Sequence, residues 1–200
     1  MKPLQNAKKS LGQNFLIDKN IINKIIEIGN INKNKSVMEI GAGYGNLTKA
    51  IICMGPKKIF AIEKDEKLAF FLKKKFKNYK NLKIINRDIL NIIEEKNLEQ
   101  NMVVFGNLPY NISTKILASL VMLKNWPPWY EVLIFMFQKE VADRIIAKTQ
   151  TKEFSRLSVL SNWRLEIKKH FNVSKNCFFP RPKINSTLLS FKPKKIIHST

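Results

Sequence analysis

The sequence predicts an α/β fold with a mostly parallel sheet that is covered by helices on both faces. Short apolar runs such as 37–40 and 59–62 alternate with longer amphipathic stretches, and this alternation favours parallel strands joined by helices. A Gly-rich segment at 41–45 follows the first run, as expected of a turn between a strand and a helix. The last two apolar runs, 165–171 and 187–191, have a Pro-rich loop and no helix between them, which predicts an antiparallel hairpin at one edge.

The other elements follow from the periodicity of the apolar residues. Asp18 is expected to cap a helix with isoleucines on one face, and Gly29 to end it. The later helices are expected at residues 46–54, 66–76, 113–123, 140–147 and 156–163. The remaining strands are expected at residues 82–86, 102–105 and 132–137.

Length and composition predict one domain without a metal. A chain of 200 residues that is 44% hydrophobic can bury a sizeable core. No apolar run reaches the roughly 18 residues that cross a membrane, and the first residues lack the apolar stretch of a secretory signal. The two cysteines and two histidines have neither zinc-site nor disulfide-framework spacing. We therefore expect a cytoplasmic, metal-free protein that does not bind a membrane.

The formal net charge of +21 indicates a polyanionic partner. A genomic bias toward Lys, Asn and Ile explains why most cations are lysines, but it does not explain the shortage of acidic residues. An excess of positive charge this large favours nucleic acid. A membrane surface is disfavoured because no basic amphipathic helix with aromatic anchors is present.

The Gly-rich turn has the composition of a cofactor site. Its glycines, Gly41, Gly43 and Gly45, allow close approach of a ligand to the backbone. The third glycine comes one residue too early for the dinucleotide pattern GxGxxG. An acid before the glycines, Glu39, and Thr48 after them are typical of S-adenosylmethionine sites. The alternative is a strand-to-helix turn that binds no ligand.

Acidic residues end the next two predicted strands. A carboxylate at Glu63 can accept hydrogen bonds from both hydroxyls of a ribose. Asp88 can accept one from the adenine amine of the same cofactor, or it can simply cap a helix that begins at Ile89. Either acid alone is more often a loop carboxylate, but three successive strand ends with Gly-rich, Glu and Asp elements form a much rarer set.

The tetrapeptide Asn107-Leu108-Pro109-Tyr110 follows the fourth predicted strand and suits the binding of a second base. The Asn side-chain oxygen and the Leu108 carbonyl can accept the two protons of an exocyclic amine. Pro109 fixes the backbone, and Tyr110 offers a ring on which the base can stack. The alternative is an ordinary turn, because Asn and Pro are common turn residues.

A late loop, 178–186, supplies further rings and cations. We expect a flipped base to lie between Tyr110 and Phe178. The alternative is that one or both of Phe178 and Phe179 pack in the core, and for Phe179 core packing is the expectation. The segment 126–129, Trp-Pro-Pro-Trp, is expected to be a loop anchored by buried rings; a rim that faces RNA is the alternative.

With these residues, the sequence resembles the bacterial small-subunit branch of the ribosomal RNA adenine N6,N6-dimethyltransferase family. Five segments in the family's order carry the resemblance: 9–16, 39–45, 107–110, 138–144 and 178–186. It implies a Rossmann-like class I methyltransferase fold with seven strands and S-adenosylmethionine as methyl donor. It implies cofactor contacts at Asn14, Leu16, Gly41, Glu63, Asp88 and Asn107.

The resemblance also implies the reaction and the partner. Two methyl groups would be transferred to each of two adjacent adenines near the 3′ end of small-subunit (16S) ribosomal RNA. The partner would be that RNA or the immature small subunit, in ribosome biogenesis, and we expect the protein to be a monomer. Residues 1–200 would form the catalytic domain, with a basic N-terminal arm at about 1–17.

Two departures from the family and two rival functions remain. Relatives usually continue into a small helical C-terminal domain, which is absent from this sequence because it is a fragment or because the lineage lost that domain. Ser155 stands where the family usually has Gly. One rival function is a ribosome-assembly factor that binds RNA, with methylation secondary or absent. The other is an antibiotic-resistance methyltransferase that acts on large-subunit RNA.

Overall fold

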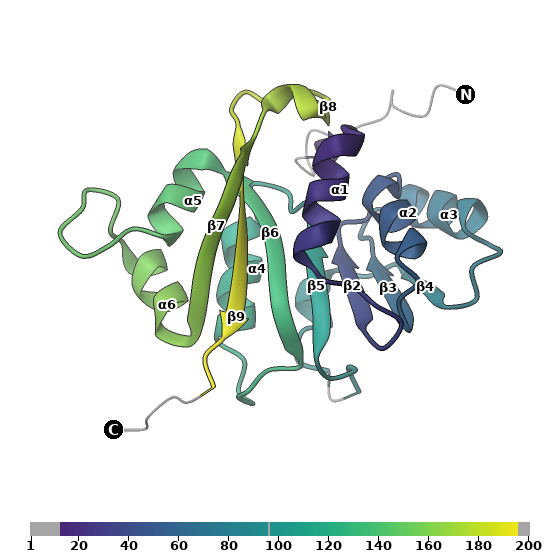
Figure 1. Ribbon diagram of the computed structural model, residues 1–200, viewed down its shortest axis with the longest axis horizontal. Helices are drawn as coiled ribbons and strands as arrows, with labels where there is room; N and C mark the ends of the chain where they lie inside the picture. Colours follow the sequence, from purple (N-terminus) through teal and green to yellow (C-terminus); the bar gives the residue numbers. More distant parts are fainter. Residues whose placement is uncertain (1–12, 96, 196–200) are drawn as a thin grey trace.

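The computed structural model describes residues 13–95 and 97–195, and a seven-stranded sheet lies at its centre (Figure 1). The strands of this sheet are β2 (Ser36–Ile40), β3 (Lys58–Ile62), β4 (Leu82–Ile85), β5 (Met102–Gly106), β6 (Tyr130–Gln138), β7 (Leu165–Val173) and β9 (Ser186–Pro193). They lie in the order β4-β3-β2-β5-β6-β9-β7. Neighbours from β4 to β6 are parallel, and β9 is antiparallel to both β6 and β7. The predicted sheet with its antiparallel edge is confirmed.

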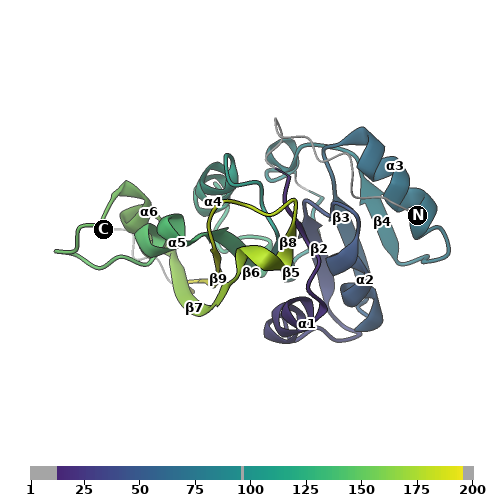
Figure 2. The same cartoon turned by 90° about the horizontal axis from the view of Figure 1, so that it is seen from above.

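Helices cover both faces of the sheet. They are α1 (Lys19–Ile28), α2 (Asn46–Cys53), α3 (Glu66–Lys75), α4 (Ser113–Val121), α5 (Lys139–Ile145) and α6 (Arg156–Arg164), with short 3₁₀ turns η3 (Ile89–Asn91) and η4 (Lys175–Cys177). Figure 2 shows α1 and α2 on one side of the sheet and α4 on the other. Side chains along β5 alternate between the two faces of the sheet. Val103 and Phe105 pack in the α1–α2 core, and Met102 and Val104 pack in the α4 core.

The elements expected from the sequence are present, with ends that differ by one or two residues. Asp18 caps α1 by accepting a hydrogen bond from the Ile21 backbone N–H at 3.0 Å, and the C-cap of α1 is Gly29. The Trp-Pro-Pro-Trp loop is anchored by its rings, as expected, although only Trp129 is buried and Trp126 is partly buried. The indole N–H of Trp129 donates to the Ile93 carbonyl, and that of Trp126 donates to the Lys194 carbonyl.

A two-stranded ribbon outside the main sheet was not expected. Strand β1 (Phe15–Leu16) pairs antiparallel with β8 (Phe178–Phe179), so the start of the described chain meets the late loop. The ribbon lies beyond the upper end of α1 in Figure 1. Strands of two residues carry no periodic pattern, and this pairing joins distant parts of the chain, so the sequence could not predict it.

Several expectations concern features that the described residues address only in part. Residues 1–12, which hold most of the basic arm and the first half of the segment 9–16, lie outside the described residues. Among the helices that are described, none is long and apolar enough to cross a membrane. No cluster of three or more His, Cys, Asp or Glu suited to a metal occurs within residues 13–95 and 97–195.

The topology places four predicted site segments side by side. The strands β4, β3, β2 and β5 are consecutive in the sheet and parallel, so their carboxyl ends form one row. Asp88, Glu63, Gly41 and Asn107 follow these four strands in the same order. The chain leaves β2 toward β3 on one side, while β5 lies on its other side. Such a switch point is where open α/β sheets bind their ligands.

Candidate active site

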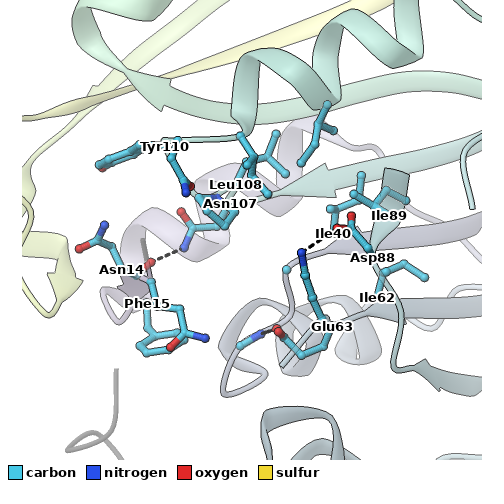
Figure 3. Close-up of a pocket in the computed structure, with 18 of the residues that line it drawn as sticks. Asn14, Phe15, Ile40, Ile62, Glu63, Asp88, Ile89, Asn107, Leu108 and Tyr110 are labelled. Carbon is cyan, nitrogen blue, oxygen red and sulfur yellow. Dashed lines mark hydrogen bonds and ion pairs between the residues drawn. The ribbon is translucent and has the colours of Figure 1, made fainter. Parts of the chain in front are cut away.

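A cleft lies at this row of strand ends (Figure 3). The sequence-predicted residues that line it are Asn14, Gly41, Gly43, Glu63, Asp88, Asn107, Leu108, Pro109 and Tyr110. In Figure 3, Asn107 lies between Tyr110 and the two acidic residues. The structure therefore brings together parts of the chain that are far apart in sequence, with two exceptions among the predicted residues, Leu16 and Phe178.

The cleft also has apolar walls, which sequence reasoning missed. Ile40 and Ile62 come from the ends of β2 and β3, and Ile89 and Ile116 come from η3 and α4. Apolar residues in these positions fit the pattern of a core, and that pattern gives no sign that one edge of a side chain faces a cleft. These walls suit a flat, weakly polar ring such as adenine.

The Gly-rich turn keeps backbone close to the cleft and to β1. Gly43 has a left-handed φ of 57°, and a Cβ at this position would lie 2.8 Å from Cδ1 of Phe15. Gly41 has a φ of 77°, and its Cβ would stand 3.6 Å from the Asn107 backbone oxygen. Side chains at these two positions would therefore press on β1 and fill the space between the first and fourth strand ends.

Glu39 in β2 and Thr48 in α2 support this turn from the two elements that it joins. Their side chains are buried, and the Thr48 hydroxyl donates to the Glu39 carboxylate at 2.5 Å. Burial raises the pKa of Glu39 to about 8, against the lowering effect of the Thr48 hydrogen bond. Glu39 is thus largely protonated at neutral pH, and it ties the start of α2 to the end of β2.

Glu63 is a buried carboxylate whose position is fixed by backbone donors. Its Oε2 accepts from the Gly43 N–H and its Oε1 from the Asp65 N–H, both at 2.8 Å. Burial raises its pKa, and these two hydrogen bonds oppose the rise. Each carboxylate oxygen can accept a further hydrogen bond, so the fixed Glu63 can still receive two hydroxyls.

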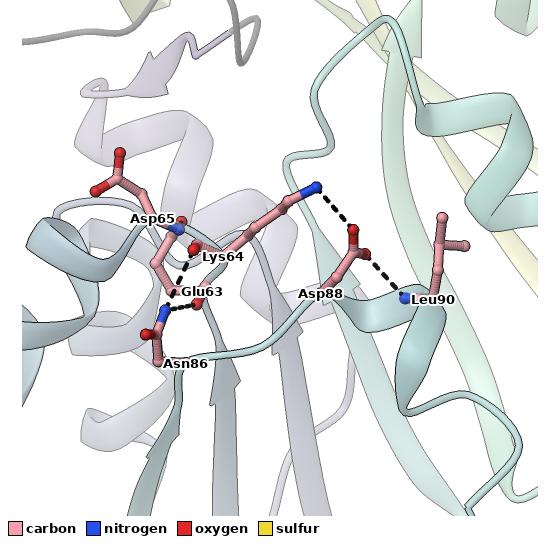
Figure 4. Close-up of polar contacts among 6 residues, drawn as sticks. All are labelled: Glu63, Lys64, Asp65, Asn86, Asp88 and Leu90. Carbon is pink, nitrogen blue, oxygen red and sulfur yellow. Dashed lines mark hydrogen bonds and ion pairs between the residues drawn. The ribbon is translucent and has the colours of Figure 1, made fainter.

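Asp88 is engaged on both oxygens (Figure 4). Oδ1 accepts from the Leu90 N–H at 3.0 Å, so Asp88 caps η3, as one reading of the sequence expected. Oδ2 forms an ion pair of 2.9 Å with the Lys64 ammonium, which reaches across from the residue after Glu63. Partial burial acts to raise the pKa of Asp88, but the hydrogen bonds from Lys64 and Leu90 outweigh it and lower the pKa. The role of Lys64 was not foreseen.

The side-chain amide of Asn107 is oriented by the segment before β1. Its Nδ2 donates to the Asn14 backbone carbonyl at 2.8 Å (Figure 3). This contact fixes which end of the amide is the oxygen. Within the described residues, no group donates to Asn107 Oδ1. The amide therefore presents a free acceptor at the cleft.

The backbone carbonyls after Asn107 differ in their engagement. The Pro109 carbonyl accepts from the Ile112 N–H at 3.1 Å, and the Tyr110 carbonyl accepts from the Ser113 hydroxyl at 3.2 Å. In the part of the chain that the structure describes, no N–H or hydroxyl donates to the Leu108 carbonyl. The second acceptor that the sequence suggested is thus unengaged among the described residues, whereas each of its two neighbours already accepts one hydrogen bond.

Tyr110 is half-buried, and its hydroxyl has a partner in another part of the chain. The Tyr110 Oη and the Ser186 Oγ lie 2.7 Å apart, and Ser186 is fully buried at the start of β9. Burial raises the pKa of Tyr110, and the Ser186 hydrogen bond opposes that rise. Ser186 belongs to the late loop segment, but its contact with Tyr110 was not expected.

The late loop requires a correction. Phe178 is 3% exposed and packs in the α1–α2 core, whereas Phe179 is 39% exposed. The predictions that Phe178 offers a free ring to a base and that Phe179 packs as core are therefore both wrong in this arrangement. Adjacent residues of a strand point to opposite faces, and the pairing of β8 with β1 turns Phe178 inward.

Leu16 lies beside the cleft and does not line it. Its side chain is buried, and it borders a small adjoining cavity together with Gly41 and Asn107. Its backbone carbonyl accepts a hydrogen bond of 2.8 Å from the Asn46 side chain. This hydrogen bond ties β1 to the first turn of α2. The role of Leu16 in the structure is therefore to support the Gly-rich turn.

Comparison with known proteins decides the family. Residues 4–198 match the family model described as ribosomal RNA adenine dimethylase. The chain belongs to the ribosomal RNA adenine dimethylase family. A ribosomal RNA small subunit methyltransferase A from Pelagibacter ubique is 51% identical over 189 residues, which cover 94% of this chain and 71% of that relative. One from Malacoplasma penetrans is 42% identical, covering 94% of this chain and 67% of the relative.

Solved structures agree with the fold of this dimethylase. A dimethyladenosine transferase from Plasmodium falciparum superposes with a TM-score of 0.78 at 30% identity, covering 90% of this chain and 63% of that one. The 23S rRNA methyltransferase ErmE has a TM-score of 0.75 at 24% identity, covering 90% and 70%, and this likeness shows the fold alone. The present chain thus spans about two thirds of the length of these relatives.

The cleft fits S-adenosylmethionine, the methyl donor of this family. The apolar walls can hold an adenine ring, and Asp88, which lines the same cleft, could accept a hydrogen bond from its amine. Glu63 has lone pairs left that could accept from ribose hydroxyls. The space beside Gly41 and Gly43, which side chains there would fill, leaves room for the rest of the cofactor.

Proposed function

We propose that this dimethylase transfers two methyl groups to the N6 amine of each of two adjacent adenines near the 3′ end of small-subunit ribosomal RNA, with S-adenosylmethionine as donor, during small-subunit biogenesis. The observation that carries the proposal is the Asn107 amide, whose nitrogen is held by the Asn14 carbonyl at 2.8 Å. Its oxygen then faces a cleft that already contains the elements of a nucleoside cofactor site.

We assign the cofactor to the strand ends of β2, β3 and β4. Gly41 and Gly43 would border it with backbone, Glu63 would accept from the ribose hydroxyls, and Asp88 from the adenine amine. Asn14 and Asn107 would border its reactive end, and Leu16 would support that end from behind. The bound cofactor supplies an electrophilic methyl group on a sulfonium centre.

The chain's own residues would prepare the target amine. The lone pair of an adenine N6 is delocalised into the ring, so the amine is a weak nucleophile. Hydrogen bonds from its two protons to Asn107 Oδ1 and the Leu108 carbonyl would direct the lone pair toward the methyl group. Pro109 holds the carbonyl in place, so catalysis is mainly positioning and electrostatics. The released proton would pass to solvent.

Tyr110 would hold the flipped base. Removal of an adenine from its stack costs a few kcal/mol, and stacking on an aromatic ring returns roughly 1–3 kcal/mol. Tyr110 lines the cleft next to the proposed acceptors, which is the position a stacking ring needs. Since Phe178 is buried, Tyr110 is the ring that the proposal assigns to the target base.

The partner follows from the charge and from the relatives. A net charge of +21 favours a polyanion, and the relatives from Pelagibacter and Malacoplasma are named for the small ribosomal subunit. We therefore assign small-subunit RNA, within the immature subunit, as the substrate of a monomeric cytoplasmic enzyme. Residues 13–195 contain the elements proposed for catalysis, as expected of a catalytic domain.

The substitution Asn107→Ala tests the mechanism. It removes one of the two acceptors for the amine, so we expect kcat to fall by about 100-fold or more, as for removal of a preorganised polar group in other active sites. Asn125→Ala, in an exposed loop, is the matched control and should retain wild-type activity. Methyl transfer near the wild-type rate by a folded Asn107→Ala protein would refute the mechanism.

A measurement of cofactor binding distinguishes the methyltransferase from the rival assembly factor. An enzyme that uses this cleft should bind S-adenosylmethionine in calorimetry, and Asp88→Ala should weaken that binding. A protein that binds RNA without binding the cofactor at millimolar concentration would be an assembly factor without methyl transfer.

A further inference from the structure

We propose that Ser186 is a positioning residue that holds the Tyr110 ring in the orientation needed to receive the target adenine. This inference rests on the proposed function, because it takes Tyr110 as the stacking platform. The two side-chain oxygens lie 2.7 Å apart. The contact joins the loop after β5 to the first residue of β9, two segments that are distant in sequence.

Ser186 is well suited to act as a fixed anchor. It is fully buried and sits in a strand that has neighbours on both sides. In the ladder it is opposite Gln138 of β6 and Val173 of β7. A hydroxyl held by a paired inner strand has little freedom to move, so its position is set by the sheet and not by the loop that carries Tyr110.

Tyr110, in contrast, needs such an anchor. It lies in the loop between β5 and α4. Its carbonyl accepts a hydrogen bond from the Ser113 hydroxyl, and its own hydroxyl contacts Ser186. The first fixes the backbone and leaves the ring free to turn about its side-chain bonds. The second holds the far end of the ring and so restrains the direction in which the ring points from the backbone.

The anchor also protects a polar group from an unfavourable environment. The Tyr110 side chain is half-buried, and this burial raises the pKa of its hydroxyl. A buried hydroxyl without a partner is unfavourable, so loss of Ser186 would push the ring toward orientations in which the hydroxyl reaches solvent. The stacking surface would then be presented to the base for only part of the time.

A double-mutant cycle tests this positioning role. Ser186→Ala and Tyr110→Phe should each lower kcat/KM for undermethylated small subunits by about 10-fold, with the dissociation constant of S-adenosylmethionine unchanged within about twofold. The double variant should be no worse than Tyr110→Phe alone, because Ser186 acts through the hydroxyl that this variant lacks. Independent effects that multiply to about 100-fold, or a wild-type Ser186→Ala enzyme, would overturn the inference.

Ser190→Ala is the matched control. Ser190 is a buried residue of the same strand, and its hydroxyl pairs with the His170 ring at 2.8 Å, outside the residues that line the cleft. It should retain wild-type kcat/KM. A loss equal to that of Ser186→Ala would show that any cavity in β9 has the same effect, and would overturn the specific role of Ser186.

A second measurement does not depend on methyl transfer. In protein labelled with ¹³C at tyrosine Cζ, the Tyr110 signal is assigned by its loss in Tyr110→Phe and followed in a pH titration. Because the Ser186 hydrogen bond lowers the pKa of Tyr110, Ser186→Ala should raise that pKa, and Ser190→Ala should leave it unchanged. If the wild-type protein transfers no methyl groups, the proposed function fails, and an unchanged Tyr110 pKa separately overturns the anchor.

Discussion

A comparison of Gly43→Ala with Gly55→Ala separates the effect of backbone strain from the effect of the close approach of β1 to the Gly-rich turn. Gly43 and Gly55 have similar left-handed φ values, 57° and 63°. An alanine in this region costs about 1–2 kcal/mol at either position. A Cβ at Gly43 would also lie 2.8 Å from Phe15, whereas a Cβ at Gly55 would have nothing within 4 Å. The two variants therefore share the strain and differ in the contact.

The consequence for the active site follows from the position of Phe15. A Cβ contact ordinarily lies at 3.4 Å or more, so Phe15 must move by about 0.6 Å or more. Phe15 follows Asn14, whose carbonyl orients the Asn107 amide. Movement of β1 should thus disturb both the cofactor end of the cleft and the amide, and misplacement of about 1 Å can cost about 100-fold in rate.

The assay combines urea unfolding with calorimetry and methyl transfer. Gly55→Ala should lose about 1–2 kcal/mol in the free energy of unfolding, and Gly43→Ala at least as much because of its contact with Phe15. Only Gly43→Ala should bind S-adenosylmethionine at least 10-fold more weakly and lose methyl transfer. Equal cofactor affinity and equal activity in the two variants would refute the argument that β1 and the Gly-rich turn form one site.

Two further predictions concern the charged residues. Lys64→Met should bind S-adenosylmethionine up to about fivefold more tightly in calorimetry. The reason is that the partly exposed ion pair between Lys64 and Asp88, worth at most about 1 kcal/mol, no longer competes with the cofactor for Asp88. Binding of the cofactor more than twofold weaker than in the wild type would contradict this. Glu39 has its pKa raised from 4.5 to about 8 by burial, so the stabilisation it gives when protonated is complete below about pH 4.5 and is lost as the pH rises to about 8. In urea unfolding at a series of pH values, the free energy of unfolding of the wild type should fall over this interval relative to that of Glu39→Gln. The control Glu94→Gln, at an exposed position, should show the same pH dependence as the wild type. Parallel plots of unfolding free energy against pH for the wild type and Glu39→Gln would contradict the prediction.

The row of strand ends could be predicted because each element has a local signal. Apolar runs mark the strands, and the Gly-rich turn, Glu63, Asp88 and Asn107 directly follow them. In parallel strands, the residues after each run must meet at one edge of the sheet. The local sequence pattern and the general topology of parallel sheets were therefore sufficient to predict the position of the cleft and most of the predicted residues that line it.

The contacts that complete the site have no such signal. The Asn14 carbonyl that orients Asn107 is a backbone group, which any residue would supply. The ion pair of Lys64 with Asp88 depends on where a long flexible side chain points. The inward and outward faces of Phe178 and Phe179 depend on the register of β8 with β1, and a shift by one residue would exchange them.

The most direct test of the central claim is a map of the bases that this protein methylates. Undermethylated small subunits are incubated with the protein and labelled S-adenosylmethionine, and the modified nucleotides are located by nuclease digestion and mass spectrometry. The proposed function predicts N6,N6-dimethyladenosine at two adjacent positions near the 3′ end of the small-subunit RNA, lost with Asn107→Ala. Absence of methylation with the wild-type protein, or methylation confined to other positions of that RNA, would contradict it.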